Sequence, residues 1–568
     1  MNAQQQILYN RNIPVEDQDA WLTASWENID DWILLKNADK AARCIHEIAK
    51  KSDSCIGILV DEDCDGASSA AIAYNFLHRC QYPCKKELIF HQAKKVHGLS
   101  DLDLDEIKEK YDLLWVPDAG STDYSDLEYL SIYLPIVITD HHEAEYESPH
   151  AIVVNNQLCD YSNKQLSGAG ITWQVCRAIE DTFRIEYMPV TKSLMGLCAF
   201  GNISDMMDYH EKEIRAISNI GLANLDNAFL SGMAAAHDYS IQKMNGLNYY
   251  SCAFYITPYV NCCFRSGTQE EKEFVVKALL DDYAYQKVES SKRGHKGEPV
   301  LWWEEAITIA ERVKRRQTKL QNDAMEFLES QIQEKNLTEN AIILCECSPD
   351  DIEASIVGLA ANKIQANYQH PTLVLRRVEE NGIEKLKGSG RNYSNCELQN
   401  MREICENTGL LELAQGHEGA FGACLPAENK QQFIEATNEA YQDIKFQPIY
   451  WVDYIWHNTA DFDKVMDIGK LNIYGQGIPE SFVAIEDLDL SQCSVHLLSR
   501  DKNPTLKIVL PNGVTIMKFK SSEEEYEEFL SDHAVLTCIG TCAINKWNGH
   551  VTPQIIIEDM ELREEWIF

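Results

Sequence analysis

Three aspartates stand at alternate positions in the segment DEDCDG, as Asp61, Asp63 and Asp65, directly after the apolar run CIGILV. Three later segments also end in acidic or imidazole side chains: LLWVPDAGS with Asp118, IVITDHHE with Asp140, His141 and His142, and CAFGNISDMMD with Asp205. Carboxylates combined with one or two imidazoles suit Mn²⁺ or Mg²⁺ better than a structural zinc ion. Two such ions that share a carboxylate would activate water and hold a phosphoryl group for in-line attack.

The elements that must position these side chains can be predicted between residue 54 and about residue 210. Short apolar runs alternate there with helical patterns, which predicts an α/β region with a parallel sheet and helices on both faces. The carboxyl ends of parallel strands meet at one edge, so the acidic and imidazole side chains are expected to converge there. One aspartate at the end of an element is usually a helix cap. Four such segments together favour a metal site, whose cations would offset the repulsion.

The remaining chain divides by pattern. Segment 303–336 has helical spacing without Gly or Pro, which predicts a long helix, and its basic residues fit a solvated face as well as phosphate contacts. From about residue 448 the pattern becomes β-rich with turn signals, which indicates a β-barrel or sandwich. The predicted parts are an N-terminal helical extension (1–53), a catalytic domain (54–300), a connecting helix (301–337), a smaller α/β domain (338–447) and a β-barrel domain (448–568).

Composition excludes several classes of protein. The net charge of −38 argues against indiscriminate binding to polyanions, so a phosphate-bearing substrate would need local positive charge or metal. The nineteen cysteines include no CxxC pair, which makes buried reduced thiols the favoured interpretation and a zinc ribbon improbable. No stretch is long and apolar enough for a membrane span, and the first residues lack the pattern of an export signal. A cytoplasmic protein is expected.

These motifs carry a family resemblance. DEDCDGASS, VPDAGS, TDHHE and GNISDMMD resemble motifs I to IV of the DHH phosphoesterases, and the closest resemblance is to RecJ, a single-strand-specific exonuclease that runs from 5′ to 3′. KGSGRNYSN and LAQGHEGAFGA resemble elements of the associated DHHA1 domain, ITPYVNCCFRSG resembles the PRINAAGR segment, and the β-rich tail resembles an OB-fold. The resemblance thus implies a parallel-sheet DHH domain, a connecting helix, a DHHA1 domain and a C-terminal OB-fold.

Roles in the metal site follow from the resemblance. It implies two Mn²⁺ or Mg²⁺ ions held by Asp61, Asp63, Asp65, Asp118, His141 and Asp205, with Asp118 as the bridge. Asp61 either binds directly or supports the other ligands. Asp140 would orient an imidazole, and His142 would face the scissile phosphate, so that the predicted catalytic residues are His142, Asp140 and Asp118. A structural histidine is the alternative for His142.

A phosphate-binding site is implied on the glycine-rich segment KGSGRNYSN, read as a loop that offers backbone N–H groups and a guanidinium. Its predicted members are Gly388, Ser389, Gly390 and Arg391, with Arg265 and His417 as further candidates. Trp547 is a candidate for stacking on bases, with a core tryptophan as the alternative. Two segments depart from the RecJ pattern, because Val96-His97-Gly98 stands where the family has GYG, and NCCFR replaces NAAGR.

The predicted function is metal-dependent 5′-to-3′ hydrolysis of single-stranded DNA to 5′-mononucleotides. Two alternatives remain: a DHH phosphodiesterase acting on short oligonucleotides or cyclic dinucleotides, and a non-catalytic RecJ-like scaffold. Single-stranded DNA is the expected partner, a single-strand-binding protein or a helicase is a further partner candidate, and a monomer is expected.

Overall fold

The computed structural model describes the chain except residues 93–95, 186–188, 394–395, 399, 443, 445–447, 500–502, 532, 548 and 565–568 and the side chain of Trp547. The chain forms two compact units, Met1–Glu311 with Val452–Phe568, and Arg312–Trp451. The first unit therefore holds both the predicted catalytic region and the C-terminal β-rich region. The finer division into five parts remains a prediction.

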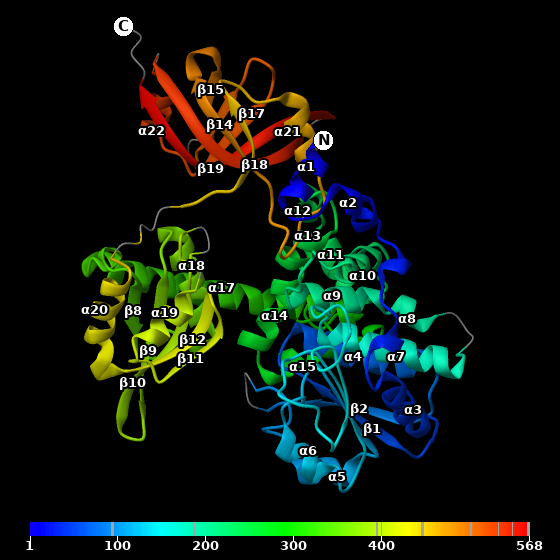
Figure 1. Ribbon diagram of the computed structural model, residues 1–568. Helices are drawn as coiled ribbons and strands as arrows, with labels where there is room; N and C mark the ends of the chain where they lie inside the picture. Colours follow the sequence, from blue (N-terminus) through cyan, green and yellow to red (C-terminus); the bar gives the residue numbers. More distant parts are fainter. Residues whose placement is uncertain are drawn as a thin grey trace. The chain divides into compact units, whose positions relative to one another are not determined.

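A five-stranded sheet lies at the centre of the catalytic region (Figure 1), with strand order β2-β1-β3-β4-β5 and every neighbouring pair parallel. Its strands are β1 (Cys55–Val60), β2 (Lys85–Phe90), β3 (Leu113–Pro117), β4 (Ile136–Asp140) and β5 (Ile152–Asn155). The parallel sheet predicted from the apolar runs is confirmed. Strand β2 was not predicted, because its sequence KKELIF begins with charged residues and its side chains are at most partly buried.

Helices cover both faces of this sheet. On one face, Ile107 of α5 (Leu104–Lys110) and Leu127 of α6 (Tyr124–Leu130) join a buried cluster with side chains of β1, β3 and β4. On the other face lie α4 (Cys64–Arg79) and α7 (Gly168–Phe183) (Figure 1). The loops at the carboxyl ends of the strands therefore emerge between two helical layers.

Further helices build out the first unit. They are α1 (Ala3–Asn10), α2 (Val15–Leu22), α3 (Ala38–Ala49), α8 (Val190–Ser193), α9 (Met195–Ser204), α10 (Lys212–Ala223), α11 (Ala228–Ala236), α12 (Asp238–Lys243), α13 (Tyr249–Tyr255), α14 (Thr257–Ser266), α15 (Gln269–Ala278) and α16 (Asp281–Ala284). A short antiparallel pair, β6 (Lys287–Glu289) and β7 (Pro299–Leu301), precedes α17 (Trp302–Glu334), the long helix predicted from the sequence.

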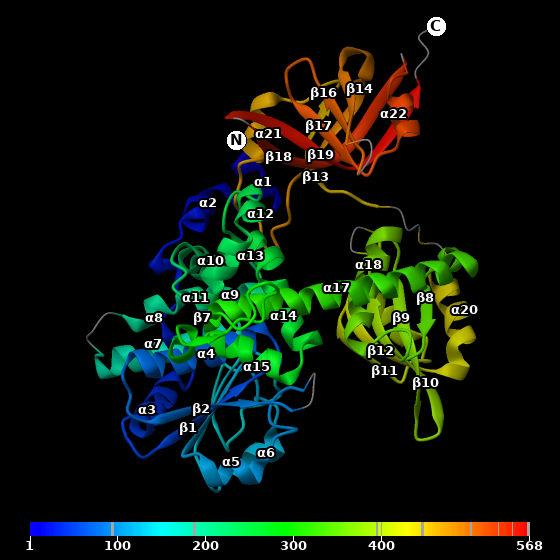
Figure 2. The same ribbon diagram turned by 180° about the vertical axis from the view of Figure 1, so that it is seen from behind.

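The second unit is a smaller α/β sandwich (Figure 2). Its sheet has the order β11-β12-β10-β9-β8, with strands β8 (Ile343–Cys347), β9 (Thr372–Glu380), β10 (Ile383–Arg391), β11 (Leu413–His417) and β12 (Ala420–Pro426). Leu328 of α17 and Ile356 of α18 (Ala354–Tyr368) pack in one buried cluster with β8. Side chains of α19 (Met401–Asn407) and α20 (Lys430–Ala440) form a second cluster with the same sheet.

The C-terminal region is β-rich, as predicted. A seven-stranded sheet has the order β13-β14-β18-β19-β17-β16-β15, with strands β13 (Val452–His457), β14 (Phe482–Asp489), β15 (Ser494–Leu498), β16 (Thr505–Val509), β17 (Thr515–Phe519), β18 (Ala534–Trp547) and β19 (His550–Glu564). Helices α21 (Phe462–Ile468) and α22 (Glu523–Phe529) accompany it. The sheet is not the closed barrel that we predicted, because no pairing joins β13 to β15 within the described part of the region.

Contacts at the N-terminus attach this region to the catalytic region. The Arg11 guanidinium pairs with the Asp453 carboxylate of β13 at 3.0 Å, and both side chains are largely buried. The N–H of Tyr209 donates to the main-chain oxygen of Gln476 at 2.8 Å.

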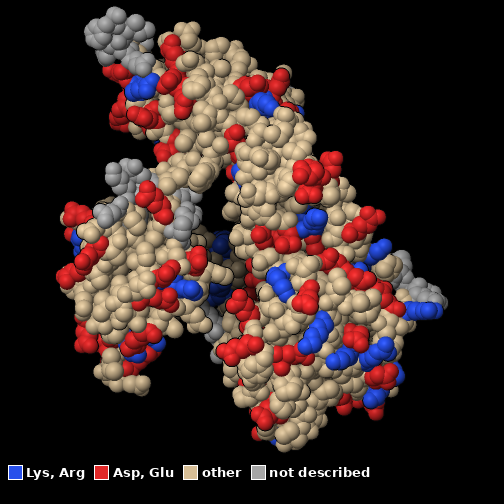
Figure 3. Space-filling model, viewed as in Figure 1, with Lys and Arg blue, Asp and Glu red and all other residues tan. Residues whose placement is uncertain are grey.

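Surface and interior agree with the composition. Acidic side chains are spread over the face shown in Figure 3, where they outnumber Lys and Arg. All nineteen cysteines are free, and most are buried. Among the described helices, none combines the length and the apolar character that crossing a membrane requires.

Candidate metal centre

The DEDCDG segment forms the turn from β1 into α4. Asp63 is the N-cap of α4, and its Oδ1 accepts a hydrogen bond from the Gly66 N–H at 3.0 Å. A Cβ on Gly66 would lie 2.5 Å from the Cβ of Asp61, so only glycine allows the chain to turn this closely. The sequence thus places Asp61, Asp63 and Asp65 around one tight turn at the end of a buried strand.

Asp118 follows β3 and is 2% exposed. Its backbone has a left-handed φ of 64°, and its N–H donates to the main-chain oxygen of Thr139 at 2.8 Å. Oδ1 of Asp118 is buried and accepts no hydrogen bond in the described structure. Burial, followed by repulsion from Asp65 and Asp63, raises the pKa of Asp118 well above its ordinary value.

Asp65 sits in the first turn of α4 and is held by α7. Its Oδ1 accepts hydrogen bonds from the Ser167 hydroxyl at 2.9 Å and from the Ala169 N–H at 3.2 Å. Burial and the neighbouring Asp63 raise the pKa of Asp65 to about 6. The acids therefore crowd together at an electrostatic cost, as expected where a cation is meant to bind.

Two glycines that the sequence analysis missed make this crowding possible. A Cβ on Gly168 would lie 2.2 Å from Oδ1 of Asp118, and one on Gly201 would lie 2.4 Å from Oδ1 of Asp65. Gly168 lies in the segment SGAG and Gly201 in the segment FGN. The one sequence signal for these contacts is a glycine inside a helical pattern, which often marks a place where another part of the chain packs closely.

Asp140 ends β4 and organises the two histidines that follow. Its Oδ1 accepts the N–H groups of His141 and His142 at 2.8 and 3.2 Å and lies 2.8 Å from Nδ1 of His142. Burial alone would raise the pKa of Asp140, but the hydrogen bond and charge of His142 outweigh it and hold that pKa well below its ordinary value. The imidazole that Asp140 orients is thus that of His142.

The two adjacent histidines differ in charge and exposure. Burial, followed by the charge of His142, lowers the pKa of His141 to about 4, whereas the hydrogen bond to Asp140 raises the pKa of His142 to about 9. A neutral imidazole is a metal ligand, and a charged one attracts phosphate. The His142 side chain is 54% exposed, which leaves it accessible to a substrate.

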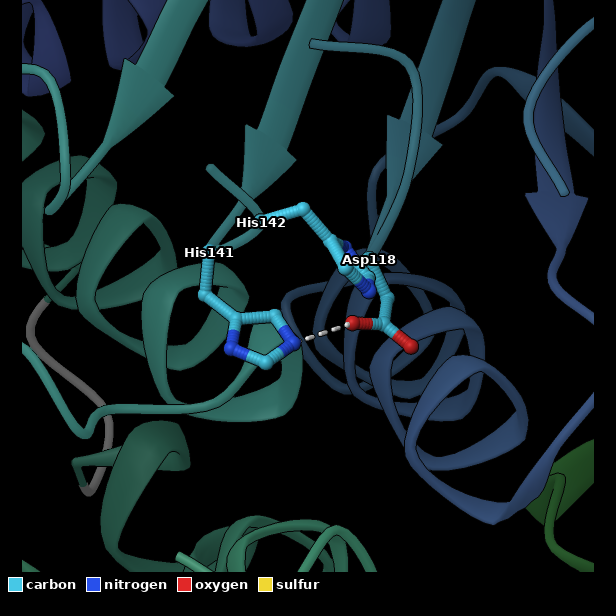
Figure 4. Close-up of side chains that lie close together, drawn as sticks. All are labelled: Asp118, His141 and His142. Atoms are coloured by element: carbon cyan, nitrogen blue, oxygen red, sulfur yellow. Dashed lines mark ion pairs between the residues drawn. The ribbon is translucent and has the colours of Figure 1, made fainter. Parts of the chain in front are cut away.

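His141 joins segments that are distant in sequence (Figure 4). Its Nε2 lies 3.3 Å from Oδ1 of Asp118 and 3.4 Å from Oδ2 of Asp205. Asp205 caps the end of helix α9, so this acid comes from a helix and not from a strand end as we predicted. Burial, with repulsion from Asp65 and Asp63, raises the pKa of Asp205 to about 8.

Three groups of these side chains could each hold a metal ion, because one ligand atom from each member lies within 4.8 Å of the others. The groups are Asp61, Asp63 and Asp118; Asp65, His141 and Asp205; and Asp118, His141 and His142. The structure therefore brings together every residue that the resemblance implied as a ligand. Asp118 and His141 each belong to two groups, and of these two only a carboxylate has two oxygens with which to bridge two ions.

Asp61 has additional partners that the sequence analysis did not anticipate. His97 Nδ1 lies 2.6 Å from its Oδ2, the Gly98 N–H donates to its Oδ1 at 3.3 Å, and His91 Nε2 lies 3.8 Å from the same Oδ1. His97 and Gly98 belong to the segment that departs from the family pattern. This segment orients Asp61 through an imidazole.

The glycine-rich segment around Ser389 is a strand and not the loop that we predicted. Gly388, Ser389, Gly390 and Arg391 lie in β10, which pairs with both β9 and β12. Their backbone N–H groups take part in the hydrogen bonds between these strands, so the prediction that they bind a phosphate is wrong. The glycines serve close strand packing, since a Cβ on Gly388 would lie 1.9 Å from the Val374 main-chain oxygen.

The side chains of this strand still gather where predicted. Ser389 and Arg391 point to the same face of the sheet, toward Gly358 of α18. A Cβ added at Gly358 would lie 3.4 Å from Oγ of Ser389 and 3.1 Å from Nη2 of Arg391. Arg391 and His417 flank Ala420 of β12 in register. In the first unit, Arg265 of α14 is exposed. Burial raises the pKa of the nearby Cys64 thiol well above its ordinary value, and the charge of Arg265 opposes this shift in part. The side chain of Trp547 lies outside the described residues.

Comparison with known proteins identifies the family. The model of the DHH family N-terminal domain matches residues 55–202, and that of the RecJ OB domain matches residues 456–559. YorK of the SPbeta prophage of Bacillus subtilis, provisionally named a single-strand DNA-specific exonuclease, is 30% identical over 567 residues, which are 98% of this chain and 95% of YorK. The chain belongs to the RecJ family.

Two further relatives support the assignment. RecJ of Bacillus subtilis, named a single-stranded-DNA-specific exonuclease, is 24% identical over 94% of this chain and 64% of its own length. The crystal structure of RecJ from Thermus thermophilus in complex with Mn²⁺ has a TM-score of 0.69 at 20% identity and covers 94% of this chain and 72% of that one. The RecJ fold predicted from the motifs is therefore confirmed.

Proposed function

We propose that this RecJ-family chain hydrolyses single-stranded DNA from its 5′ end and releases 5′-mononucleotides, using two Mn²⁺ or Mg²⁺ ions at the carboxyl edge of the sheet. The observation that carries the proposal is the convergence of the Asp118 and Asp205 carboxylates on Nε2 of His141, at 3.3 and 3.4 Å. The names of the relatives support the substrate, and the Mn²⁺ complex of Thermus thermophilus RecJ supports the cofactor.

The donor set fits two divalent cations. Asp61 and Asp63 would hold one ion, Asp65, His141 and Asp205 the other, and Asp118 would bridge them. Two bound cations supply a nucleophile of lowered pKa and positive charge opposite the phosphate oxygens. Oδ1 of Asp118 supports this assignment, since it is buried and accepts no hydrogen bond from the described residues, and its neighbour His141 is itself a proposed ligand.

His142 is proposed to contact the scissile phosphate. Asp140 occupies Nδ1 of the ring, so Nε2 is left to face the substrate from the exposed side of the site. A hydrogen bond from Nε2 to a phosphate oxygen would stabilise the charge that develops there, and the same nitrogen can protonate the leaving oxygen. Asp140 acts through His142 by fixing its orientation.

Recognition of the 5′ end is proposed for the side chains of Ser389 and Arg391. A guanidinium and a hydroxyl on the same strand face suit a terminal phosphate, and His417 lies in register beside them. Arg265 is a second phosphate candidate on the metal-bearing unit. The C-terminal RecJ OB domain is proposed to guide the single strand.

End-labelled DNA tests the proposal. We expect a single strand labelled at the 5′ end to release its label as a mononucleotide at once, and one labelled at the 3′ end to release it only late. A blunt duplex of the same sequence should survive. Release of the 3′ label first would contradict the direction, and equal digestion of the duplex would contradict the strand specificity.

A further inference from the structure

A buried lysine lies directly behind the metal-binding turn. Lys272 of α15 has a side chain that is 4% exposed, and its Nζ forms an ion pair and hydrogen bond with the carboxylate of Glu62, which is 3% exposed. Glu62 is the residue between Asp61 and Asp63. It belongs to none of the groups that could hold a metal ion, because its side chain points to α15 instead.

The same lysine reaches a second strand end. Lys272 Nζ also donates to the main-chain oxygen of His91 at 3.2 Å, and His91 directly follows β2. The His91 ring is fully buried, with Nδ1 bonded to Asp101 and Nε2 3.8 Å from Oδ1 of Asp61. One ammonium group therefore ties the ends of two neighbouring strands, and each of these ends leads to Asp61.

We propose that Lys272 is a positioning residue for the metal centre, acting through Glu62 and His91 to fix the turn that carries Asp61 and Asp63. The inference rests on the proposed function, since it concerns the same site. Residues that follow the end of a strand have no strand-to-strand hydrogen bonds to hold them in place. Carboxylates that bind the same cations must nevertheless be held in precise positions. Lys272 supplies that restraint through Glu62 and His91, neither of which belongs to the three groups of described residues that could hold a metal ion.

The effect of Lys272 is geometric. The charge of Glu62 compensates that of the lysine, so the pair adds little net field to the metal site. An arginine in place of Lys272 should therefore preserve function. Two apolar side chains of similar volume in place of Glu62 and Lys272 should keep the fold but lose the restraint on the turn.

Calorimetric titration of the metal-free full-length chain with Mn²⁺ tests the proposal. The double variant Glu62→Leu/Lys272→Met is expected to bind Mn²⁺ on the order of tenfold more weakly than the wild type, the size of effect seen when a group that orients a ligand is removed. The single variant Lys272→Arg, in which Glu62 keeps a cationic partner, should bind Mn²⁺ nearly as tightly as the wild type. Lys430→Met, which breaks an ion pair with Glu346 in the second unit, is the matched control and should bind Mn²⁺ like the wild type.

Activity measurements separate positioning from a general structural effect. In the double variant, the Mn²⁺ concentration for half-maximal DNA hydrolysis should rise by the same factor while the KM for DNA stays unchanged. Mn²⁺ affinity within twofold of the wild type in the folded double variant would overturn the proposal.

Two safeguards keep the test decisive. If the double variant does not fold, Glu62→Ala alone cuts the link between the turn and Lys272 and leaves the hydrogen bond of Lys272 to His91 in place. Wild-type Mn²⁺ affinity in that variant would overturn the proposal as well. Mn²⁺ binding is measured without DNA, so a wild type that binds Mn²⁺ but degrades no DNA would refute the proposed function and leave this inference testable.

Discussion

Nε2 of His141 lies 3.3 Å from Oδ1 of Asp118, although the two residues follow different strands of the sheet. The same nitrogen lies 3.4 Å from Oδ2 of Asp205, which follows a helix. One largely buried imidazole thus meets two carboxylates from separate parts of the chain. Such a cluster is unfavourable without a cation, because burial and repulsion raise the pKa of both acids. This conflict gives the first prediction.

Asp118→Asn should stabilise the metal-free protein and abolish its activity. Burial and repulsion raise the pKa of Asp118, which means that its ionised form is disfavoured in the folded state, so removing the charge should raise the free energy of unfolding. Urea denaturation at neutral pH without metal measures the gain. Hydrolysis of single-stranded DNA should fall at least about a hundredfold, because a shared ligand is lost. A destabilised variant would contradict the account of the cluster.

His142→Gln should lose catalysis while Mn²⁺ binding persists. The ring is exposed and braced by Asp140, which fits a group that acts on the phosphate. Loss of such a group costs about 10²- to 10⁴-fold in turnover. Single-turnover hydrolysis and Mn²⁺ calorimetry on the same preparation measure the two effects. A tenfold loss of Mn²⁺ affinity would instead make His142 a ligand, as its group with Asp118 and His141 allows.

Arg391→Met should remove a preference for 5′-phosphorylated ends. A charge-assisted pair with a phosphate contributes about 1.5–3 kcal/mol, or roughly 10- to 100-fold in the ratio of kcat/KM for phosphorylated over hydroxyl ends. Arg377→Met is the control, since Arg377 of β9 pairs with Glu346 and Glu384. An unchanged ratio in Arg391→Met would refute the role given to the strand face of β10.

Glu213→Gln should flatten the dependence of stability on pH. Glu213 is 3% exposed, accepts hydrogen bonds from Tyr161, Asn163 and Gln174, and also faces the charge of Asp30. Burial raises its pKa from 4.5 to about 7, so the native state holds this proton more tightly than the unfolded chain does. The resulting stability is present below pH 4.5 and is lost as pH rises to about 7.

Urea denaturation of wild type and Glu213→Gln across that interval measures the difference. The wild type should lose up to about 3 kcal/mol more than the variant between the two ends of the range. Parallel curves would contradict the assignment to Glu213.

The metal-site residues could be predicted because their signals are local. DEDCDG, VPDAGS and TDHHE each place acids or imidazoles directly after an apolar run, and parallel strands bring such ends together. The position of Asp205 at a helix end was harder to predict, since CAFGNISD is apolar enough for a buried strand or a buried helix.

Other features depend on tertiary packing and leave little trace in the sequence. Lys272 looks like an ordinary surface lysine in EEKEF until α15 packs against Glu62. The segment KGSGR reads as a loop because glycine disfavours strands, yet close contact with Val374 and Phe421 requires glycine within β10. The open sheet of the C-terminal region reflects which strands pair at long range, which periodicity alone does not encode.

Anomalous diffraction from crystals soaked in Mn²⁺ tests the central claim most directly. The account predicts two anomalous peaks about 3.5–4 Å apart at the carboxyl edge of the sheet, both in contact with Asp118, and one of them bound to His141 and Asp205. Mn²⁺ peaks only elsewhere on the chain, with the carboxylate of Asp118 in contact with no ion, would contradict it.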